Sequence, residues 1–462
     1  MALEDSGFSS FPSRILLAGD EVVGLATRGG VRDNARFLGA HLFDPGAQVA
    51  NVKAYGASGS FATTTLTSAA GAGATSITVA DAATFDLGQG IHIVGAGAGG
   101  VRYIGTVTNK SGNVLTISPP TSTAVSSGTV VKHDDTVGIQ AAINSLPLGG
   151  IVFLPRDRYR LTGPLVLGPR VSLIGAGGGR YQEEGATSLQ WSDITTGNGI
   201  QLGGNTNYNR IQGMQLRGPG LNNLNTTGVV AAYGFNFTMQ DVLIYGWGIG
   251  ANYYGMQGQH FGIEIINCYG DCLLLRESQR FSSFGSMYSN SVVGSNVHLN
   301  ADGAGCHDIH FYDPAIDEAG GIASVQIDKG TDISFNNMLI YSAKNSGTGN
   351  AYGVRLGDGT NTPSRVRLHN VRVQPFNLSD PPSVLAKNIY LRGSGHSLIN
   401  VTTAVMAGFS GADIQDDSSD SVWVNTRMAN GIVRHKLRLP TSSVSVASGE
   451  LYSNAGVVTV KP

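Results

Sequence analysis

The chain has 462 residues, of which 65 are glycine, 41% are hydrophobic and only 13% are charged. Its formal net charge of −2 gives no electrostatic reason to expect nucleic acid or an anionic membrane surface as a partner. The hydrophobic fraction is large enough for a packed core, which excludes a disordered Gly/Ser-rich chain, and no stretch approaches the ~20 apolar residues of a membrane span.

Residues 1–50 are expected to form an N-terminal lead or linker. Their first part, MALEDSGFSSFPSR, has no basic segment followed by an apolar one, so we expect no signal peptide. Residues 51–132 begin with NVKAYGASG and continue with short β-prone runs such as VRYIGTVTNKSGNVLTIS, separated by Gly, Ser and Asn turns. This pattern predicts a small β module.

The cysteines predict neither a disulfide framework nor a metal centre. There are three, Cys268, Cys272 and Cys306, and we expect them to be buried apolar residues of a protein made in a reducing compartment. His307 follows Cys306, but a fourth ligand with zinc spacing is missing. We therefore expect no metal and no cofactor.

One short helix is predicted over residues 135–146. Ile139, Ala142, Ile143 and Leu146 form an apolar stripe at helical spacing after an acidic start. Beyond Pro147 the sequence reads IVFLP, YRL and PLVL, which is typical of strands, and no convincing helix follows.

Two short strand patterns then alternate along the chain. The first, G-Φ-x-Φ-x, recurs every 20 to 35 residues, with its first apolar residues at Ile200, Val229, Ile249, Leu273, Val297, Val325, Val354 and Ile389. The second interleaves with it in segments such as GMQLRG, DVLIYG, GIEIIN, DIHFYD and NMLIYS. A period of this length with strands and turns alone predicts an all-β solenoid whose coils stack about 4.8 Å apart, with the helix capping its open end. An irregular β-sandwich is the alternative.

Several segments resemble the pectate-lyase-like right-handed parallel β-helix superfamily, which includes polysaccharide lyases, glycosidases, epimerases and bacteriophage tailspikes. The resemblance rests on NVKAYGASG from Asn51, DDTVGIQAAI from Asp134, and GGIVFLPRDRYRLTGPLVL, in which Asp157 replaces the usual turn glycine. It implies a parallel β-helix over residues 133–430. The ending LRLPTSSVSVASGELYSNAGVVTVKP resembles that of phage tail proteins, which implies a strand pair and possible trimer contacts within residues 431–462.

Stacked coils would turn alternate residues into columns on the solvent face, and one column is predicted to be rich in tyrosine. Tyr245, Tyr288, Tyr312 and Tyr341 fall at the same phase of the second pattern. Exposed aromatic faces stack on sugar rings, so these residues are candidate substrate contacts. Packing of the tyrosines on each other or on a neighbouring subunit is the alternative.

Candidate catalytic acids cluster beside this column. HDIHFYDPAIDEAGG supplies His310, Asp313, Asp317 and Glu318, and Glu264 lies about two coils away at the same phase. Glycoside hydrolysis needs two carboxyl groups, about 5 Å apart for retention and about 6.5–9.5 Å apart for inversion. Glu264 could face Asp313, and Asp317 could pair with Glu318, the favoured general acid. Alternatively, the aspartates are turn residues that bind their own backbone.

A second polar set follows the first pattern and includes His298 and Arg355. These side chains either pair with neighbouring acids or hold an anionic sugar, and pairing is favoured. β-Elimination would instead require a base and a neutralised carboxylate, roles that His310, with Tyr312 or Tyr288 and with Arg355 or Arg372, could fill. Calcium-binding Asp clusters of pectate lyases are not evident.

The resemblance and the predicted acids favour a tailspike-like depolymerase that binds and hydrolyses a bacterial surface polysaccharide, either capsule or O-antigen. By resemblance we expect a homotrimer in the virion, attached to the phage tail or baseplate through its N-terminus. A secreted polysaccharide lyase, epimerase or transglycosidase on the same fold is one alternative. A non-catalytic carbohydrate-binding tail protein or adhesin is the other.

Overall fold

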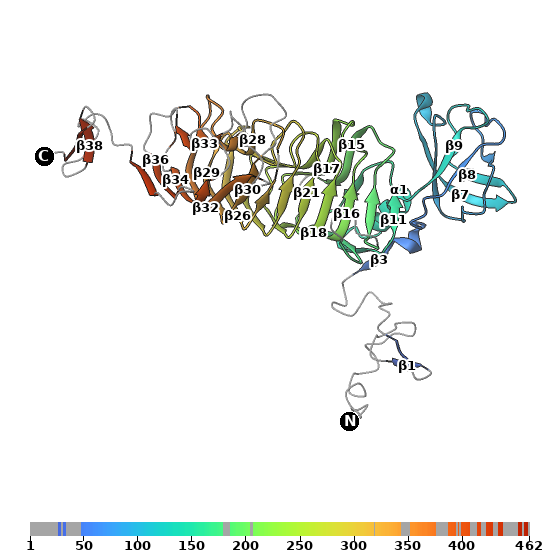
Figure 1. The fold of residues 1–462 in the computed structure, drawn as a ribbon. Coiled ribbons are helices and arrows are strands. Elements are labelled where there is room, and N and C mark those ends of the chain that lie inside the picture. Colours follow the sequence, from blue (N-terminus) through green and yellow to red (C-terminus); the bar gives the residue numbers. More distant parts are fainter. Residues whose placement is uncertain are drawn as a thin grey trace.

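A computed structural model gives the fold of the chain (Figure 1). It describes residues 48–178, 185–203, 207–317, 319–342, 352–375, 387–393, 396 and 399–406, together with separate strands at 26–28, 31–33, 414–416, 422–427, 433–437, 451–454 and 457–460. Apart from 3-10 turns, the one helix in this described part is α1, Thr136–Asn144. No helix in it is long and apolar enough to cross a membrane.

An antiparallel sheet of six strands stands at one end of the molecule (Figure 1). Its order is β4-β9-β6-β7-β8-β5, and it has its own apolar core around Phe85, Ile91 and Leu115. The bounds are β4 Thr63–Thr65, β5 Ser76–Thr78, β6 Gly90–Ile93, β7 Tyr103–Ser111, β8 Val114–Ser118 and β9 Val130–Asp134. The alternating apolar residues between Gly, Ser and Asn turns therefore form a separate β module.

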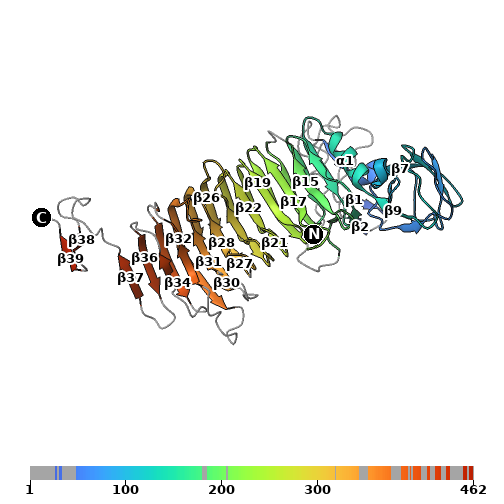
Figure 2. The same cartoon turned by 90° about the horizontal axis from the view of Figure 1, so that it is seen from above.

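The rest of the described chain winds into a right-handed parallel β-helix. Figure 2 shows its strands following one another along the length of the molecule. A 10-stranded sheet contains β12 Leu165–Leu167, β15 Thr196–Leu202, β17 Asn225–Ala232, β19 Ile249–Tyr254, β22 Leu273–Arg276, β25 Val297–Leu299, β28 Ala323–Ile327, β31 Tyr352–Leu356, β33 Lys387–Leu391 and β35 Ile414–Asp416.

A 19-stranded sheet forms the remaining wall of the solenoid. Its strands are β3 Val49–Asn51, β10 Gly150–Leu154, β11 Arg158–Arg160, β13 Val171–Gly175, β14 Ser188–Gln190, β16 Arg210–Arg217, β18 Phe237–Tyr245, β20 Gly258–Phe261, β21 Glu264–Ile266, β23 Gln279–Phe284, β24 Met287–Ser289, β26 Cys306–Tyr312, β27 Ala315–Ile316, β29 Gly330–Asn336, β30 Leu339–Ser342, β32 Pro363–Pro375, β34 Ile399–Met406, β36 Val422–Arg427 and β37 Val433–Leu437. All neighbours in it pair in parallel except β36 and β37.

This sheet bends at one position in each central coil. The bend residue has a left-handed backbone at Asp241, Gly262, Gly285, Asp313 and Asn337, with φ between 51° and 56°. The bend separates β20 from β21, β23 from β24, β26 from β27 and β29 from β30. Glycine, Asn and Asp tolerate this conformation best, which explains which residue types occupy the column.

The first strand pattern sets the register of the 10-stranded sheet. Ile200 pairs with Val229, and Leu273, Val297, Val325, Val354 and Ile389 continue the same buried column. Ile249 is the exception, because Ala251 occupies its place between Val229 and Leu273. The predicted solenoid and its apolar column are confirmed.

Helix α1 covers the first coil, as the apolar stripe predicts. It begins one residue later and ends two residues earlier than expected, and Ile139, Ala142 and Ile143 join the core. Asp135 precedes it and is fully buried. Its carboxylate accepts hydrogen bonds from the backbone N–H groups of Ser58, Gly59 and Arg160. The two segments of the family resemblance, separated by the β module, therefore meet at this carboxylate.

The remaining elements are short. The 3-10 turns η3 and η4 span Val52–Tyr55 and Ala98–Gly100, and β1 Ala26–Arg28 pairs antiparallel with β2 Val31–Asp33. Near the C-terminus β38 Leu451–Asn454 pairs antiparallel with β39 Val457–Val460, which matches the expected strand pair. Cys268, Cys272 and Cys306 are buried and free, as expected.

Candidate functional site

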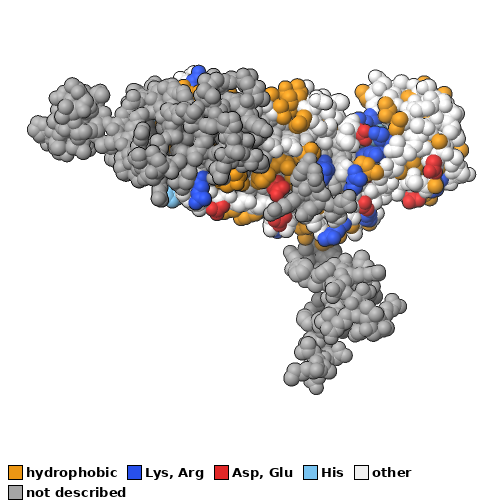
Figure 3. Space-filling model, in the orientation of Figure 1, with side chains coloured by type: hydrophobic (Ala, Val, Ile, Leu, Met, Phe, Trp, Pro, Cys, Tyr) orange, Lys and Arg blue, Asp and Glu red, His pale blue; other side chains and the backbone are white. Residues whose placement is uncertain are grey.

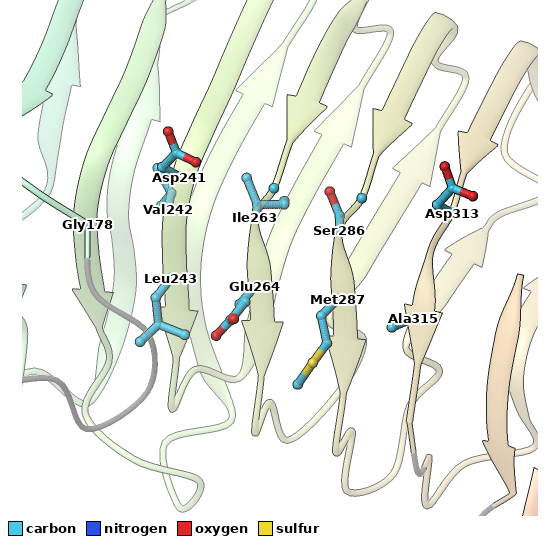
Figure 4. Close-up of a pocket in the computed structure, with 12 residues that line it drawn as sticks. Gly178, Asp241, Val242, Leu243, Ile263, Glu264, Ser286, Met287, Asp313 and Ala315 are labelled. Carbon is cyan, nitrogen blue, oxygen red and sulfur yellow. The ribbon is translucent and has the colours of Figure 1, made fainter.

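A groove of about 570 Å³ follows the bend of the long sheet across successive coils (Figure 4). Three carboxylic acids line it: Asp241 on β18, Glu264 at the start of β21, and Asp313 between β26 and β27. The other lining residues are small or apolar, namely Gly178, Val242, Leu243, Gly262, Ile263, Gly285, Ser286, Met287 and Ala315. The groove therefore concentrates acidic groups on a surface that otherwise offers little charge.

Asp241 and Glu264 come from neighbouring coils. Leu243 pairs with Glu264, so Asp241 lies one coil and two residues away from Glu264. This corresponds to about 8 Å between their backbone positions. The Asp241 carboxylate leans over the next coil, because a Cβ added to Gly262 would lie 3.5 Å from Asp241 Oδ1. Glycine at this bend leaves the space above the coil open.

Asp313 closes the other end of the groove. It lies two coils and two residues from Glu264, or about 12 Å along the backbone positions. Its Oδ1 atom accepts a hydrogen bond of 3.0 Å from Asn337 Nδ2, and Asn370 Nδ2 donates to Asn337 Oδ1 at 2.9 Å. Figure 4 shows Asp241 and Asp313 projecting to one side of the bend and Glu264 to the other.

A row of aromatic side chains borders the groove. Each of them is the residue immediately before the bend of its coil. Phe261 stacks on Phe284 with 5.1 Å between ring centroids, and Phe284 stacks on Tyr312 at 4.9 Å, with the planes within 7° of parallel. Each ring face inside the row is covered by its neighbour. The row therefore presents mainly apolar ring edges to solvent, rather than open faces.

The predicted column of four tyrosines is wrong. Tyr288 is fully buried, and its hydroxyl bonds to Ser283 Oγ at 2.8 Å and to His260 Nδ1 at 3.3 Å, so it is no substrate contact. The bend residue of its coil is Gly285, which puts Met287 outside and Tyr288 inside. A one-residue error in phase exchanges the two faces of a strand.

The other three tyrosines lie at the surface but do not form one column. Tyr312 is on β26, where it pairs with Phe284 and Asn336 on the opposite side of the bend from Tyr245 and Tyr341. Tyr245 and Tyr341 share one column and are four coils apart, a distance of about 19 Å. The segment DIHFYD therefore belongs to the strands before the bend.

Two of the remaining predicted catalytic residues, Asp317 and His310, do not line the groove. Asp317 follows β27, outside the groove, and its Oδ2 atom accepts a hydrogen bond from Ser289 Oγ at 3.2 Å. Glu318 lies outside the described residues. His310 is on β26, with Nε2 at 2.8 Å from Asp308 Oδ1 and Nδ1 at 2.8 Å from Ser334 Oγ. Asp241, which the sequence patterns did not identify, is the groove acid nearest to Glu264.

His298 and Arg355 belong to a separate paired network on the 10-stranded sheet. His298 contacts Asp271 through Nδ1 and Asp328 through Nε2, each at 2.9 Å, and Arg355 donates to Asp328 Oδ1 at 2.7 Å. Burial alone would lower the pKa of His298, but its hydrogen bonds to the two carboxylates outweigh burial and raise it to about 9. This network fits the favoured alternative, in which the side chains pair with one another.

The described residues contain no group of three or more His, Cys, Asp or Glu side chains that could hold a metal ion. Charged side chains are sparse on the described part of the face in Figure 3, where Lys and Arg gather mainly next to the β module. The groove acids therefore have no metal site beside them in this part of the chain.

No family model and no curated protein matches the sequence. Among solved structures, the chain is similar to tailspike protein 2 of an Escherichia coli O157:H7 bacteriophage, with 11% identity, a TM-score of 0.46, and coverage of 73% of this chain and 47% of the tailspike. It is similar to alginate lyase from Paenibacillus sp. str. FPU-7 with 13% identity, 61% and 96% coverage and a TM-score of 0.48. It is also similar to PfbA, a surface adhesin of Streptococcus pneumoniae, with 13% identity, coverage of 71% of this chain and 95% of PfbA, and a TM-score of 0.44. The chain thus spans about half the length of that tailspike.

Proposed function

We propose that the groove binds a bacterial surface polysaccharide, capsule or O-antigen, and hydrolyses its glycosidic bonds. The observation that supports this most directly is the presence of Asp241, Glu264 and Asp313 in one groove. A long groove along stacked coils suits an extended sugar chain, and paired carboxyl groups are the usual machinery for cleaving it.

Asp241 and Glu264 are the proposed catalytic pair. Their backbone positions lie about 8 Å apart on neighbouring coils, which leaves room between them for the sugar and the water molecule that inversion requires. They project to opposite sides of the bend (Figure 4), so a sugar in the groove would meet one carboxyl group on each side. Asp313, farther along, is placed to contact the sugar chain rather than to complete the pair.

In the proposed reaction Glu264 is the general acid and Asp241 the general base. Glu264 lies between the two aspartates and has one more methylene with which to reach the glycosidic oxygen. It gives its proton to that oxygen as the bond to the anomeric carbon breaks. Asp241 takes a proton from a water molecule whose oxygen forms the new bond to the same carbon, so hydrolysis inverts the configuration.

The test is incubation with purified capsular and O-antigen polysaccharides, followed by measurement of new reducing ends. Glu264→Gln and Asp241→Asn should each lower turnover by about 100-fold or more, which is the usual contribution of a general acid or base. Asp86→Asn, an exposed carboxyl of the β module, is the matched control and should keep full activity. Full turnover in both groove variants would refute the assignment.

Elimination is the second candidate reaction, and His310 is the residue that favours it. Asp308 and Ser334 orient its ring, the Tyr312 ring centroid lies 6.3 Å away, and Asp313 of the groove follows on the same coil. Arg367, two coils along the same column, is placed to neutralise a uronic acid carboxylate. If the wild type forms an unsaturated, ultraviolet-absorbing product and His310→Ala does not, the reaction is elimination and not hydrolysis.

We also propose that the protein acts as a homotrimer in a phage tail. The support is the sequence resemblance to tailspikes, including the C-terminal segment that contains β38 and β39. Light scattering of the full chain should give three times the mass of one chain.

The outcome of the cleavage assay also distinguishes an enzyme from a binding protein. Retention of the polysaccharide without any product would identify a binding protein or adhesin instead of an enzyme.

A further inference from the structure

A cluster of exposed aromatic residues lies on three neighbouring coils, ahead of the strands that carry the groove. Tyr208, Tyr233 and Phe235 have exposed fractions of 61%, 54% and 51%. Backbone hydrogen bonds join Tyr208 to Phe235 and Tyr233 to Tyr254, so the coils are adjacent. These four residues form what we call the aromatic platform.

The platform differs from the stacked row of Phe261, Phe284 and Tyr312 because Tyr233 and Tyr254 meet nearly at a right angle instead of stacking in parallel. The Tyr233 ring lies against the next coil, because a Cβ added to Gly255 would be 2.8 Å from Tyr233 Cδ1. Tyr254 meets the Tyr233 ring edge-on, at 5.0 Å and 86°. Although Gly255 and Tyr254 lie against it, Tyr233 is still 54% exposed, so part of its ring is accessible for stacking on a sugar ring.

Two of the platform residues have a backbone conformation that is unfavourable for an aromatic residue. Tyr208 has a φ of 61° and Tyr233 a φ of 50°, in the left-handed region that glycine and Asn adopt more easily. Large exposed rings at these positions add conformational cost without entering the core. Such backbone conformations are often found at binding sites, where the surrounding structure holds them in place.

The platform leads into the strands that carry the groove. On the coil of Tyr233, residues 234–236 and the strand segment Phe237–Gln240, which itself spans about 13 Å, precede Asp241. On the next coil, Gly258–Phe261 connects the platform to Glu264 in the same way. The surface between them carries the polar side chains of Thr238 and Gln259, which alternate with buried residues.

The charge around the platform suits a sugar chain better than a strongly charged partner. Arg276 lies 5.3 Å from the centroid of the Tyr254 ring and forms an ion pair with Asp302. The hydrogen bond with Tyr233 and the nearby Glu277 carboxylate raise the pKa of the Tyr254 hydroxyl. A rim with both signs of charge and with hydrogen-bonding groups around exposed rings matches a polyhydroxylated ligand.

We propose that the aromatic platform is a distal subsite that binds the same polysaccharide chain as the groove. The chain would cross the coils from Tyr233 to the pair of Asp241 and Glu264, and the sugar nearest the platform would stack on Tyr233. The inference rests on the proposed function for the identity of the ligand. It predicts that longer chains bind better because they reach both sites.

The test compares Tyr233→Gly with Leu87→Ala, each introduced into the Glu264→Gln protein, which should bind without cleaving. Glycine accepts the φ of this position, so the fold should persist. Leu87, 62% exposed in the β module, is the control for loss of exposed apolar surface. On an array of purified capsular and O-antigen polysaccharides, Tyr233→Gly should weaken binding about tenfold, in keeping with one lost stacking contact. Leu87→Ala should leave binding unchanged.

The wild-type background separates this inference from catalysis. With active enzyme, Tyr233→Gly should raise KM for the polymer about tenfold, leave kcat unchanged, and have little effect on oligosaccharides too short to reach the platform. Equal binding by Tyr233→Gly and its parent, while the wild type cleaves, overturns the subsite alone. Loss of binding in Tyr233→Gly, when the wild type makes no product, supports the subsite and refutes catalysis. A change of oligomeric state in Tyr233→Gly, or no binding by the Glu264→Gln protein, overturns the inference.

Discussion

The buried His260 should make the stability of the solenoid depend on pH. Its side chain lies in the core, where Nε2 is 2.9 Å from the Tyr253 hydroxyl, and burial lowers its pKa to about 3 from an ordinary 6.5. Below pH 6.5 the unfolded chain takes up a proton that the folded chain refuses, so the free energy of unfolding falls as pH falls. The slope is about 1.4 kcal/mol per pH unit, and the effect reaches roughly 5 kcal/mol near pH 3.

Replacing His260 by Gln removes this titration and keeps a polar side chain between the hydroxyls of Tyr253 and Tyr288. The variant is expected to be less stable than the wild type near neutral pH. The difference should shrink by about 1.4 kcal/mol for each pH unit below 6.5. Urea unfolding can be followed by the fluorescence of Trp191 and Trp247, which are fully buried 5.4 Å apart in the same core.

The control is His369→Gln, because His369 is exposed at the surface on β32. It should follow the wild-type pH dependence through this range. Parallel curves for the wild type and His260→Gln would refute the conclusion that His260 stays neutral in the folded core.

Three further predictions concern the core and the first coil. His298→Gln should remove a pH-dependent loss of stability: because the folded pKa is raised, the wild type is stabilised below pH 6.5 and loses roughly 3 kcal/mol as pH rises to about 9. If urea unfolding showed that the wild type and His298→Gln lose the same free energy of unfolding between pH 6.5 and pH 9, this prediction would be contradicted. Tyr288→Ala should cost about 3–5 kcal/mol in the same assay and Tyr312→Ala under about 1 kcal/mol, whereas equal costs would place Tyr288 at the surface. Asp135→Ala should cost about 3 kcal/mol or more, because three backbone N–H groups lose their acceptor, and an unchanged melting temperature would show that this carboxylate does not join the two segments.

The repeat pattern predicted the fold because coil stacking imposes a regular demand on the sequence. Each coil must bury an apolar residue at the same place, and the column from Ile200 through Val229 to Ile389 meets that demand. Ala251 replaces Ile249 in the column because β19 begins with Ile249 and Gly250, two residues earlier in register. Such local shifts leave the fold unchanged.

The outer face was predicted less well, because its phase depends on where each coil bends. In the coil of Tyr288 the bend is at Gly285, followed by Ser286, which offers no apolar residue to mark the phase. In the next coil the bend is at Asp313 and is followed by Pro314, so the alternation before the bend in DIHFYD imitates the alternation that follows the bend in other coils. Each error moved a tyrosine to the wrong face or strand.

Asp241 was missed for a related reason. It precedes VLIY in the chain and reads as an ordinary turn residue, yet it holds the same left-handed position as Gly262, Gly285 and Asp313. Aligning the coils on this bend, rather than on their apolar residues, would have placed Asp241 and Asp313 on the same line and Glu264 between them. The signal was present in the turn residues.

The central claim is that the acids of the bend groove act on a sugar chain. Its most direct test is the structure of the Glu264→Gln protein with an oligosaccharide released from a polysaccharide that the wild type cleaves. We expect a sugar chain in the groove, with a glycosidic oxygen within hydrogen-bonding distance of residue 264 and the anomeric carbon on the Asp241 side. A chain bound away from Asp241 and Glu264, for example along Tyr245 and Tyr341, would contradict it.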